Sequence, residues 1–335
     1  MDEWYIRRYE EKDETVWDEF IKKESINGVF LQSRKFLNYH KPGRFQDCSI
    51  MVYLNEKLVA VCPACEIFED GEKVFFSHKG STYGGLVLCR EVYKTQKLLE
   101  LMETVEEYVK EQGYDRIVFK PTMNLLSAPS MDLMEYCFYY RNYTEYKEIN
   151  TYINYRNYDT EVLNNLSKMK QRIIKKCIKN EMSFYELQEE SEVEAFHEIL
   201  SKNLMKFEKK PVHTVEELLE LKMKRFPEEI HFFGVKYERK LVAGTMVFEF
   251  SEKKCAHTQY LAADPDYNKL SPMSFVYYKV AEYYMKKGYD ALSWGISTED
   301  LGRYINMGLT NNKEEFGSEH GLIKIYEKSI KKMDR

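Results

Sequence analysis

The sequence predicts an α/β protein of the α+β type, built as two tandem copies of one domain with a mixed, mostly antiparallel central sheet flanked by helices. Three observations predict this. The tetrapeptide Lys-Leu-Val-Ala at 57–60 returns at 240–243. A Glu-Tyr pair, followed by Gly-Tyr-Asp and an apolar strand, occurs at 107–115 and again with the same spacing at 282–290. Each half also has an order of strands and helices that fits neither a doubly wound sheet nor a barrel.

The length of the repeat indicates a duplicated domain. A period of roughly 180 residues is far longer than a solenoid repeat and close to the size of a domain. The 335 residues are enough for two domains that each bury a core. We expect an N-terminal domain over 1–158 and a C-terminal domain over 159–335, which opens with a basic helix at 163–180.

Composition and charge exclude several classes of protein. The net charge of -5 gives no overall attraction to DNA or to an anionic membrane, so any phosphate-binding surface must be local. The seven cysteines, an odd number, indicate a reducing compartment, and we expect Cys62 and Cys65 to be strand residues rather than metal ligands. No apolar run reaches the ~18 residues of a membrane span, and the acidic start has no signal core. We therefore expect a soluble cytoplasmic protein without a metal; nothing in the sequence indicates its oligomeric state.

The elements of the first half follow from local patterns. A short Asn55-Glu56 turn separates two apolar strands, and Gly113 ends a long amphipathic helix. We expect strands at 4–9, 48–54, 57–68, 73–77, 117–119 and 147–155, and helices near 16–21, 36–37 and 95–112.

The second half repeats this order. Thr214 and Glu217 form a predicted capping box, and Ser271 with Pro272 predicts the start of a helix that Gly288 ends. In that helix start, we expect the Ser271 side chain to accept from the open amides. We expect strands at 183–187, 230–235, 241–250, 255–263, 290–294 and 323–326, the last of them ending the second sheet, and helices at 193–207 and 215–226.

Several motifs of the second half resemble the FemAB-like branch of the GNAT acyltransferases, which carry two such domains in tandem. The resemblance rests on the basic stretch 169–177, on Leu-Val-Ala-Gly-Thr at 241–245 and on His-Thr-Gln-Tyr at 257–260. Trp-Gly-Ile-Ser-Thr at 294–298 and Lys-Glu-Glu-Phe-Gly at 313–317 complete it. In the first half, the resemblance rests on the repeat and on the glycine-rich segment 78–85. It implies an acyltransferase that forms an amide bond on an amine acceptor, namely a peptide, a cell-wall precursor or an amino sugar.

The candidate catalytic residues are polar groups that the motifs bring to the second half. Amide formation by direct attack requires a neutral amine, an aligned donor and a cation or hydrogen-bond donor beside the developing oxyanion. The resemblance assigns phosphate binding and charge stabilisation to Lys313, although Asn312 stands where the family has Phe. His257 or Tyr260 is a candidate base or acceptor-binding group, and the alternative for both is a packed strand residue. Tyr304, expected on a short helix after Gly302, matches the acidic tyrosine of many GNAT enzymes, although an ordinary packed tyrosine is the favoured interpretation.

Two further sets of residues are binding candidates. The basic helix carries six cations in twelve residues with no acidic residue among them, and an apolar seam of Leu166, Met169, Ile173 and Cys177. Uncompensated like charges destabilise a helix, which favours an anionic partner such as a pyrophosphate or a tRNA acceptor end, over a solvated face. Its donor-binding candidates are Lys170, Arg172, Lys175 and Lys176. The acceptor-binding candidates are His78, Tyr83, Gly84, Gln259, Trp294 and Ser297.

The sequence favours aminoacyl-tRNA over acetyl-CoA as the donor co-substrate, with no cofactor tightly bound. GNAT enzymes that use acetyl-CoA hold its pyrophosphate on a glycine-rich loop at a helix N-terminus. The corresponding loop here, 263–270, has two aspartates and no glycine. Two alternatives stay open. One is an acyl-CoA-dependent N-acetyltransferase acting on an amino sugar or small amine, and the other is a non-catalytic binding protein on a GNAT scaffold.

Overall fold

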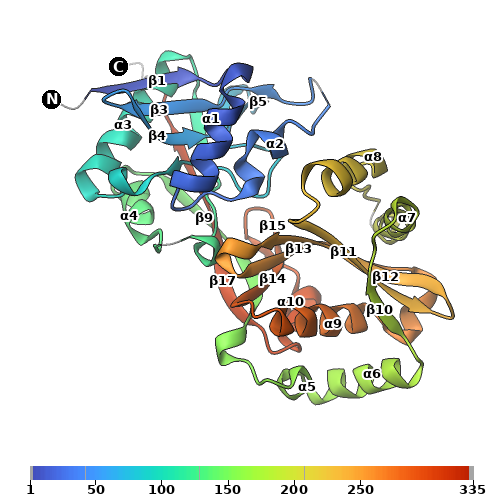
Figure 1. Cartoon of the computed structure of the whole chain (residues 1–335). Coiled ribbons are helices and arrows are strands. Elements are labelled where there is room, and N and C mark those ends of the chain that lie inside the picture. The colour runs from blue at the N-terminus through green and yellow to red at the C-terminus, as the bar shows by residue number, and fades with distance from the viewer. Residues whose placement is uncertain (1–2, 42, 128, 207, 332–335) are drawn as a thin grey trace. The chain divides into compact units, whose positions relative to one another are not determined.

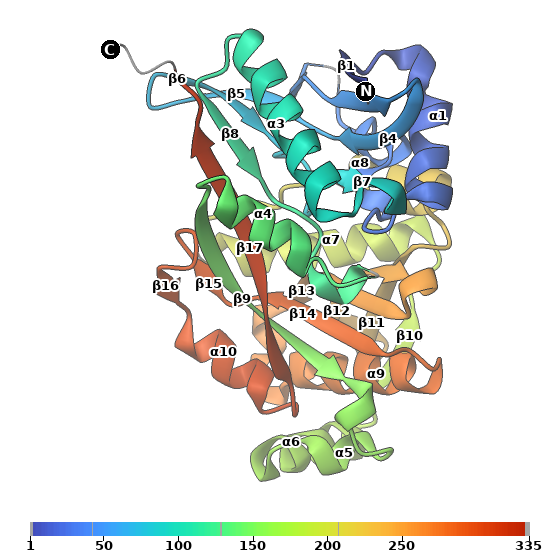
Figure 2. The same cartoon turned by 90° about the vertical axis from the view of Figure 1, so that its left-hand side faces the viewer.

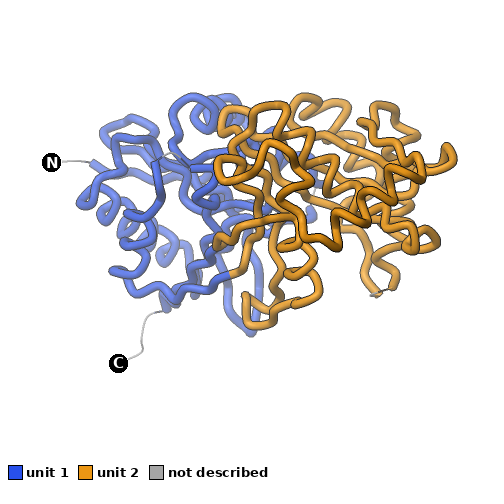
Figure 3. Tube along the Cα trace, turned by 90° about the horizontal axis from the view of Figure 1, so that it is seen from below, with its two compact units in different colours: residues 1–147, 323–335 blue, residues 148–322 orange. Residues whose placement is uncertain are grey.

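The chain divides into two compact units in the computed structural model, which describes residues 3–41, 43–127, 129–206 and 208–331. Unit 1 contains residues 1–147 and 323–335, and unit 2 contains residues 148–322 (Figure 3). The chain enters unit 2 within strand β9 (Thr144–Asn154) and leaves it within strand β17 (Glu319–Ser329). The predicted boundary of the duplication, after residue 158, stays a prediction.

Unit 1 has two groups of strands. One has the order β1-β3-β4-β7 and is antiparallel; its strands are β1 (Trp4–Arg8), β3 (Ile50–Leu54), β4 (Lys57–Cys62) and β7 (Val87–Leu88). The other has the order β17-β8-β6-β5-β2, with β8 (Arg116–Phe119), β6 (Glu72–Phe76), β5 (Cys65–Glu69) and β2 (Gln46–Asp47). In this second group β6 and β8 are parallel. The predicted turn between β3 and β4 is confirmed, since Asn55 and Glu56 both have positive φ.

The helices of unit 1 include the amphipathic helix that the sequence predicts. Helix α3 (Thr95–Glu111) buries Leu98, Leu101, Met102 and Val109, and Gly113 follows it with φ +77°. The other helical segments are Glu11–Asp13, α1 (Glu14–Glu19), the π-helical Phe20–Glu24, Phe30–Gln32, α2 (Arg34–Leu37), Arg90–Val92, Asn124–Leu126 and α4 (Asp132–Tyr140).

Unit 2 is built on one sheet of order β10-β11-β12-β13-β14-β9. Its strands are β10 (Ser183–Glu186), β11 (Ile230–Tyr237), β12 (Lys240–Phe250), β13 (Cys255–Ala263), β14 (Ala291–Ile296) and the second half of β9. Only β13 and β14 pair in parallel; the other pairs in this sheet are antiparallel. A two-stranded ribbon of β15 (Thr298–Glu299) and β16 (Tyr304–Ile305) follows β14 and leads into α10 (Met307–Glu314), as Figure 2 shows.

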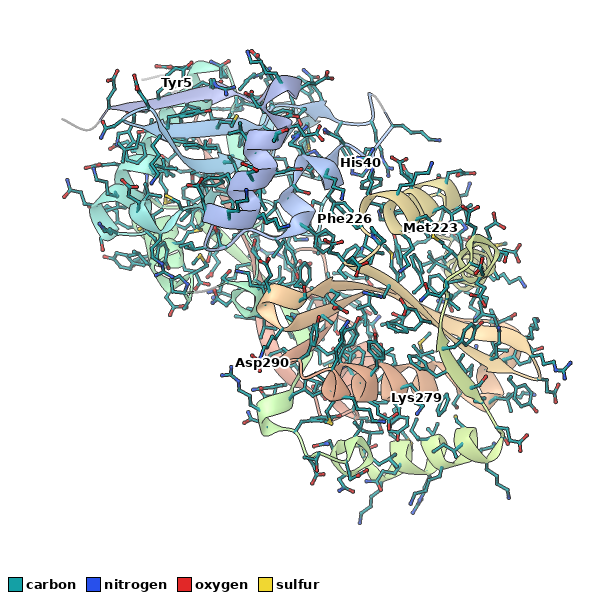
Figure 4. All side chains as sticks on the ribbon, viewed as in Figure 1. Tyr5, His40, Met223, Phe226, Lys279 and Asp290 are labelled. Atoms are coloured by element: carbon teal, nitrogen blue, oxygen red, sulfur yellow. The ribbon has the colours of Figure 1, made fainter. Side chains whose placement is uncertain are left out.

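Helices cover both faces of this sheet (Figure 1). Helix α7 (Glu190–Met205) packs on one face and α9 (Pro272–Lys286) on the other, where the basic helix α6 (Lys168–Lys179) packs against α9. Lys279 on α9 is labelled in Figure 4. The other helical segments are Tyr155–Asn157, α5 (Val162–Asn165), α8 (Val215–Leu219), the π-helical Glu220–Arg225, Ser251–Lys253 and Pro265–Leu270. Among the described residues, no helix is both long and apolar enough to cross a bilayer.

The strand predicted at 323–326 forms but does not end the second sheet. As part of β17, residues 326–329 pair with β8 in unit 1, whereas residues 150–154 of β9 pair with β14 in unit 2. The strand that follows unit 1 in sequence, β9, thus pairs in unit 2, and the strand that follows unit 2, β17, pairs in unit 1. An alternating strand pattern fixes which side chains face a core but not which neighbour the strand joins, so the sequence could not predict this exchange.

Two local predictions are wrong and three are confirmed. The Ser271 side chain makes no capping hydrogen bond, because Ser271 has φ +56° and only its backbone oxygen accepts from Ser274 N. Tyr304 lies in β16, not on a helix. The predicted helix at 215–226 is confirmed, as α8 followed by the π-helical Glu220–Arg225. The capping box of Thr214 with Glu217 is confirmed, as is the left-handed Gly288 that follows α9.

The buried face of α6 also differs from the predicted seam. Leu166, Lys170, Ile174 and Cys177 are buried, whereas Met169 is 54% exposed. Lys170 can face inward because its amine donates to Asn312 Oδ1 at 2.6 Å and lies 3.4 Å from a Glu315 carboxylate oxygen. A buried cation with such partners avoids most of the cost of leaving water, and the apolar face therefore shifts by one position.

Candidate active site

Strands β13 and β14 stop pairing at the point where polar side chains gather. Their parallel ladder contains three pairs and ends at His257–Ser293, although both strands continue beyond it. The β12–β13 register shifts so that Gln259 has no opposite residue, and the β14–β9 register shifts between Ser293 and Ile296. Such bulges re-aim side chains and are common next to active sites. The two strands therefore leave each other at a place lined by His257 and Ser293.

The amine of Lys313 donates to two backbone carbonyls of β14, just after its last pair with β13. Helix α10 begins at the Asn306 cap, whose side chain accepts from Leu309 N at 3.0 Å, and carries Lys313 in its last turn. The Lys313 Nζ donates to Gly295 O at 2.9 Å and to Ile296 O at 2.8 Å, and the residue is 2% exposed. Burial without a described carboxylate partner lowers the pKa of Lys313 to about 7. The amine can therefore act as a cation or as a neutral donor near neutral pH.

Gly295 connects Lys313 with His257. Its carbonyl accepts from Lys313, and its N–H donates to Ser293 Oγ at 3.2 Å. Gly295 has φ +76°, and a Cβ built there would lie 3.5 Å from His257 Cε1. A side chain at this position would therefore strain the backbone and lie in van der Waals contact with the imidazole. The structure brings Lys313 and His257 to opposite sides of one glycine.

His257 belongs to a buried chain of hydrogen bonds. Its Nδ1 lies 3.0 Å from Ser293 Oγ, which donates to Asn150 Oδ1 at 2.9 Å. Neither Ser293 nor Asn150 was a candidate from the sequence. Serine in a buried strand carries no local signal of function, and Asn150 comes from β9, more than a hundred residues earlier.

Tyr260 has a partner that the sequence did not indicate. Its hydroxyl lies 2.5 Å from His213 Nδ1, and the two rings meet edge to face. His213 directly precedes the capping Thr214, and its backbone oxygen lies 3.0 Å from His197 Nε2. Tyr260 thus remains a candidate for acceptor binding, now with an imidazole bound to its hydroxyl.

The other candidates of unit 2 have different surroundings. Trp294 is 2% exposed; its indole N–H donates to Ser318 Oγ, and its ring lies 4.6 Å from that of Tyr277, as expected for a core residue. Ser297 is buried, and its hydroxyl has no partner among the described residues. Tyr304 is 60% exposed on its short strand. Gln259 is the bulge residue of β13.

Comparison with known proteins places this site in a family. The sequence profile of the acetyltransferase (GNAT) domain matches residues 167–304, which include His257 and Gly295. Residues 167–304 are a GNAT acetyltransferase domain. The chain therefore contains a GNAT acyltransferase domain, and Lys313 lies outside the matched region, in helix α10. No curated protein matches the sequence.

Solved structures with a similar fold cover both units of this acyltransferase. The structure of FemX shares 11% identity over 96% of both chains, with a TM-score of 0.69. A tandem GNAT protein from the clavulanic acid biosynthesis pathway shares 8% identity over 100% of both chains, with a TM-score of 0.57. L-PGS from Bacillus licheniformis shares 11% identity over 82% of both chains, with a TM-score of 0.56. At these identities the similarity establishes a tandem GNAT fold.

The loop that holds the CoA pyrophosphate in acetyl-CoA-dependent GNAT enzymes does not fit that group here. Asp264, 1% exposed, accepts from Asp266 N at its side chain and from Tyr267 N at its backbone oxygen. Ser271 N donates to Asn268 O within the same segment. A pyrophosphate in the loop before α9 would meet three amides that already have acceptors, and the buried Asp264 carboxylate beside them.

Most of the donor-binding candidates on α6 lie in solvent. Arg172, Lys175 and Lys176 are exposed, and no described residue forms an ion pair with them. Lys170 is the exception, since its amine is bound by Asn312 next to Lys313. Lys168 and Lys179 are exposed as well, so the helix presents five cations outward and directs Lys170 toward α10.

The acceptor candidates His78, Tyr83 and Gly84 belong to unit 1. His78 is 3% exposed, its Nδ1 accepts from Gly80 N, and its burial lowers the pKa of the imidazole to about 4. A Cβ at Gly84 would lie 2.1 Å from Ser77 O, so only glycine fits there. Tyr83 is fully buried. These residues form a tightly packed turn in unit 1, and the polar cluster around Gly295 belongs to unit 2. The described residues contain no cluster of three His, Cys, Asp or Glu side chains that could bind a metal ion.

Proposed function

We propose that this acyltransferase moves an aminoacyl group from a charged tRNA onto the amine of a peptide, a cell-wall precursor or an amino sugar. The observation that carries the proposal is the loop before α9, where the buried Asp264 and the internally bonded amides disfavour a CoA pyrophosphate. The similarity to FemX supports it at the level of the fold. The resemblance of the sequence motifs to the FemAB-like branch implies such a donor.

The basic helix α6 gives the tRNA a place to bind. Arg172, Lys175 and Lys176 project into solvent without ion pairs to described residues. A phosphate backbone that neutralises such cations releases bound counterions, which makes affinity strongly dependent on salt. A small acyl-CoA thioester carries too few phosphates to give the same dependence.

The residues around Gly295 supply the chemistry. The acceptor amine attacks the ester carbonyl of the aminoacyl group, the new carbon–nitrogen bond forms, and the bond to the ribose oxygen breaks. Lys313 in its protonated form stabilises the negative charge that develops on the carbonyl oxygen or the tRNA phosphate. His257 accepts the proton that the amine loses and passes it to the departing ribose oxygen. Gln259, Tyr260 and Ser297 are proposed to contact the acceptor. His78, Tyr83 and Gly84 stay acceptor-binding candidates from the sequence.

A paired binding measurement tests the donor. Purified protein is titrated with charged tRNA and, separately, with acetyl-CoA, each over a series of salt concentrations. The proposal expects saturable tRNA binding that weakens steeply with salt, and no binding of acetyl-CoA. Binding of acetyl-CoA alone would contradict it.

The family match favours a second candidate, an acyl-CoA-dependent N-acetyltransferase acting on an amino sugar or small amine. CoA thioesters would then raise the melting temperature, because a ligand that binds only the native state stabilises it. A scaffold without catalytic activity is the third candidate, and it predicts that Lys313→Ala changes no activity at all.

A further inference from the structure

Three tyrosines form an exposed aromatic surface on helix α4 of unit 1. Tyr136, Tyr139 and Tyr140 are spaced i, i+3 and i+4, so they share one face of the helix. They are 53%, 78% and 60% exposed. The ring of Tyr136 lies 6.5 Å from that of Tyr139 and 6.3 Å from that of Tyr140, and the second pair is stacked, with 29° between the ring planes. These three rings, which we call the tyrosine platform, thus form one surface.

The opposite face of α4 holds the tyrosine platform in place. Met134 and Phe138 are buried, and the Phe138 ring stacks on that of Tyr326 at 4.2 Å. Arg141, which follows the helix, donates to both carboxylate oxygens of Glu106, at 2.8 and 2.9 Å. A tyrosine side chain has only two rotatable bonds, so binding a ligand on these rings costs little conformational freedom of the protein. The platform is therefore prepared to bind before a ligand arrives.

The polar groups at the platform determine which ligands it favours. No described residue forms a hydrogen bond with the three phenol hydroxyls, so each of them can donate and accept. Asp132, one turn before Tyr136, is exposed and forms no ion pair with a described residue. Two neighbouring cations, Arg141 and Lys324, already have carboxylate partners. The charge that these residues leave unpaired is negative, which disfavours a phosphate-bearing ligand and favours one with hydroxyl and ammonium groups.

We propose that the tyrosine platform binds an oligosaccharide that carries amino groups, with its sugar rings lying on the tyrosine rings. The face of an aromatic ring carries partial negative charge, which attracts the polarised C–H groups of a sugar ring and an ammonium group. The phenol hydroxyls bind the sugar hydroxyls, and the Asp132 carboxylate pairs with an ammonium. Three rings with centroids more than 6 Å apart cover more than one sugar unit. This site belongs to unit 1, and it requires neither the proposed donor nor the chemistry around Lys313 in unit 2.

Calorimetric titration of the full chain with a β-1,4-linked glucosamine pentamer tests this site, and saturable binding is expected. Tyr139→Ala, which removes the most exposed of the three rings, should weaken binding about tenfold, because an aromatic contact is lost. Tyr139→Phe keeps the ring and should weaken binding much less. Tyr5→Ala, which removes a tyrosine 56% exposed on β1, is the matched control, and melting curves check the fold of each variant. Absence of saturable binding, or wild-type affinity in Tyr139→Ala, would overturn the proposal.

Further titrations separate the role of charge and the class of ligand. Asp132→Asn should weaken binding of the glucosamine pentamer and reduce its salt dependence, while binding of the N-acetylated pentamer stays the same. Equal affinity of Asp132→Asn and wild type for the glucosamine pentamer would contradict the amino-sugar assignment. A single-stranded RNA that binds the wild type but not Tyr139→Ala, in the absence of pentamer binding, would make the platform a nucleobase site and overturn the proposal.

The platform and the proposed function fail independently. Charged tRNA should bind Tyr139→Ala as it binds the wild type, because the basic helix α6 is unchanged in this variant. A wild type that binds the pentamer but transfers no aminoacyl group would refute the proposed function and confirm the platform. A wild type that transfers aminoacyl groups but binds no pentamer would do the reverse.

Discussion

The two units carry corresponding parallel strand pairs that end in different residues: an apolar pair in unit 1 and a pair of polar side chains in unit 2. In unit 1, α3 and the Gly-Tyr-Asp turn lead to β8, which pairs with β6 through three residues and ends at Phe76–Val118. In unit 2, α9 and the same turn lead to β14, which pairs with β13 through three residues and ends at His257–Ser293. The hydrogen bond just before the first pair of each ladder also corresponds: Asp115 N donates to Lys73 O, and Asp290 N donates to Lys254 O.

The difference lies beyond the third pair. In unit 1 the chains stay together, since Ser77 N donates to Val118 O and Lys120 N donates to Ser77 Oγ. In unit 2 the strands separate, and Lys313 donates to the Gly295 and Ile296 carbonyls of β14, which do not pair with β13. A duplicated scaffold thus keeps this helix and turn in both copies, while the residues at the end of the strand pair differ.

The largest effect is expected from Lys313→Met. Loss of the buried cation should reduce kcat by about 10²- to 10³-fold, the usual cost of losing one group that stabilises a developing negative charge. Initial rates and a melting curve measure the loss of activity and the retention of fold. Lys286→Met, which changes a lysine 72% exposed on α9, is the matched control. Equal activity in both variants would show that Lys313 does not take part in the reaction.

The next largest effect is expected from His257→Phe, which gives unit 2 the residue type found at position 76 in unit 1. Without its base the transfer rate should fall about 10²-fold. The fold should persist, because Ser293 still donates to Asn150 and accepts from Gly295. The control is His320→Phe, whose side chain is 43% exposed. Unchanged transfer by His257→Phe would remove the proposed distinction between the two units.

A smaller effect is expected from Lys175→Glu combined with Lys176→Glu on α6. Affinity for charged tRNA should fall by about tenfold or more. The slope of log affinity against log salt should become shallower by the amount expected for losing about two phosphate contacts. The melting temperature should change little, since both side chains are exposed. Lys110→Glu on the exposed face of α3 provides a control in unit 1. A salt slope equal to that of the wild type would make α6 a solvated face.

The smallest effect concerns stability against pH. The pKa of Lys313 is lowered to about 7 in the folded protein, below its unfolded value, so the unfolded chain binds one more proton between these two values. The free energy of unfolding should therefore rise with pH from about 7 upward, by at most about 1.4 kcal/mol per pH unit from this residue. Urea unfolding of the wild type and Lys313→Met at pH 7 and pH 9 isolates this contribution. A rise of equal size in both proteins would show that Lys313 keeps an ordinary pKa.

Local features of this protein were predictable, and long-range ones were not. The turn at Asn55 and the amphipathic face of α3 depend on neighbours within a few residues, and both are confirmed. The exchange of β9 and β17, the inward Lys170 and the hydroxyl of Tyr260 on His213 depend on partners far along the chain. Resemblance to GNAT motifs located His257 and Lys313, but only the fold places Ser293 and Asn150 behind His257.

Transfer of label from charged tRNA tests the central claim most directly. A pool of tRNA charged with radiolabelled amino acids is incubated with wild type or His257→Phe and a small set of peptide, amino-sugar and cell-wall precursor acceptors. The account predicts that wild-type protein moves label from tRNA into an amide-linked product and that His257→Phe does so about 10²-fold more slowly. Label that stays on tRNA at the rate of spontaneous hydrolysis, while acetyl-CoA supports acylation of the same acceptors, would contradict it.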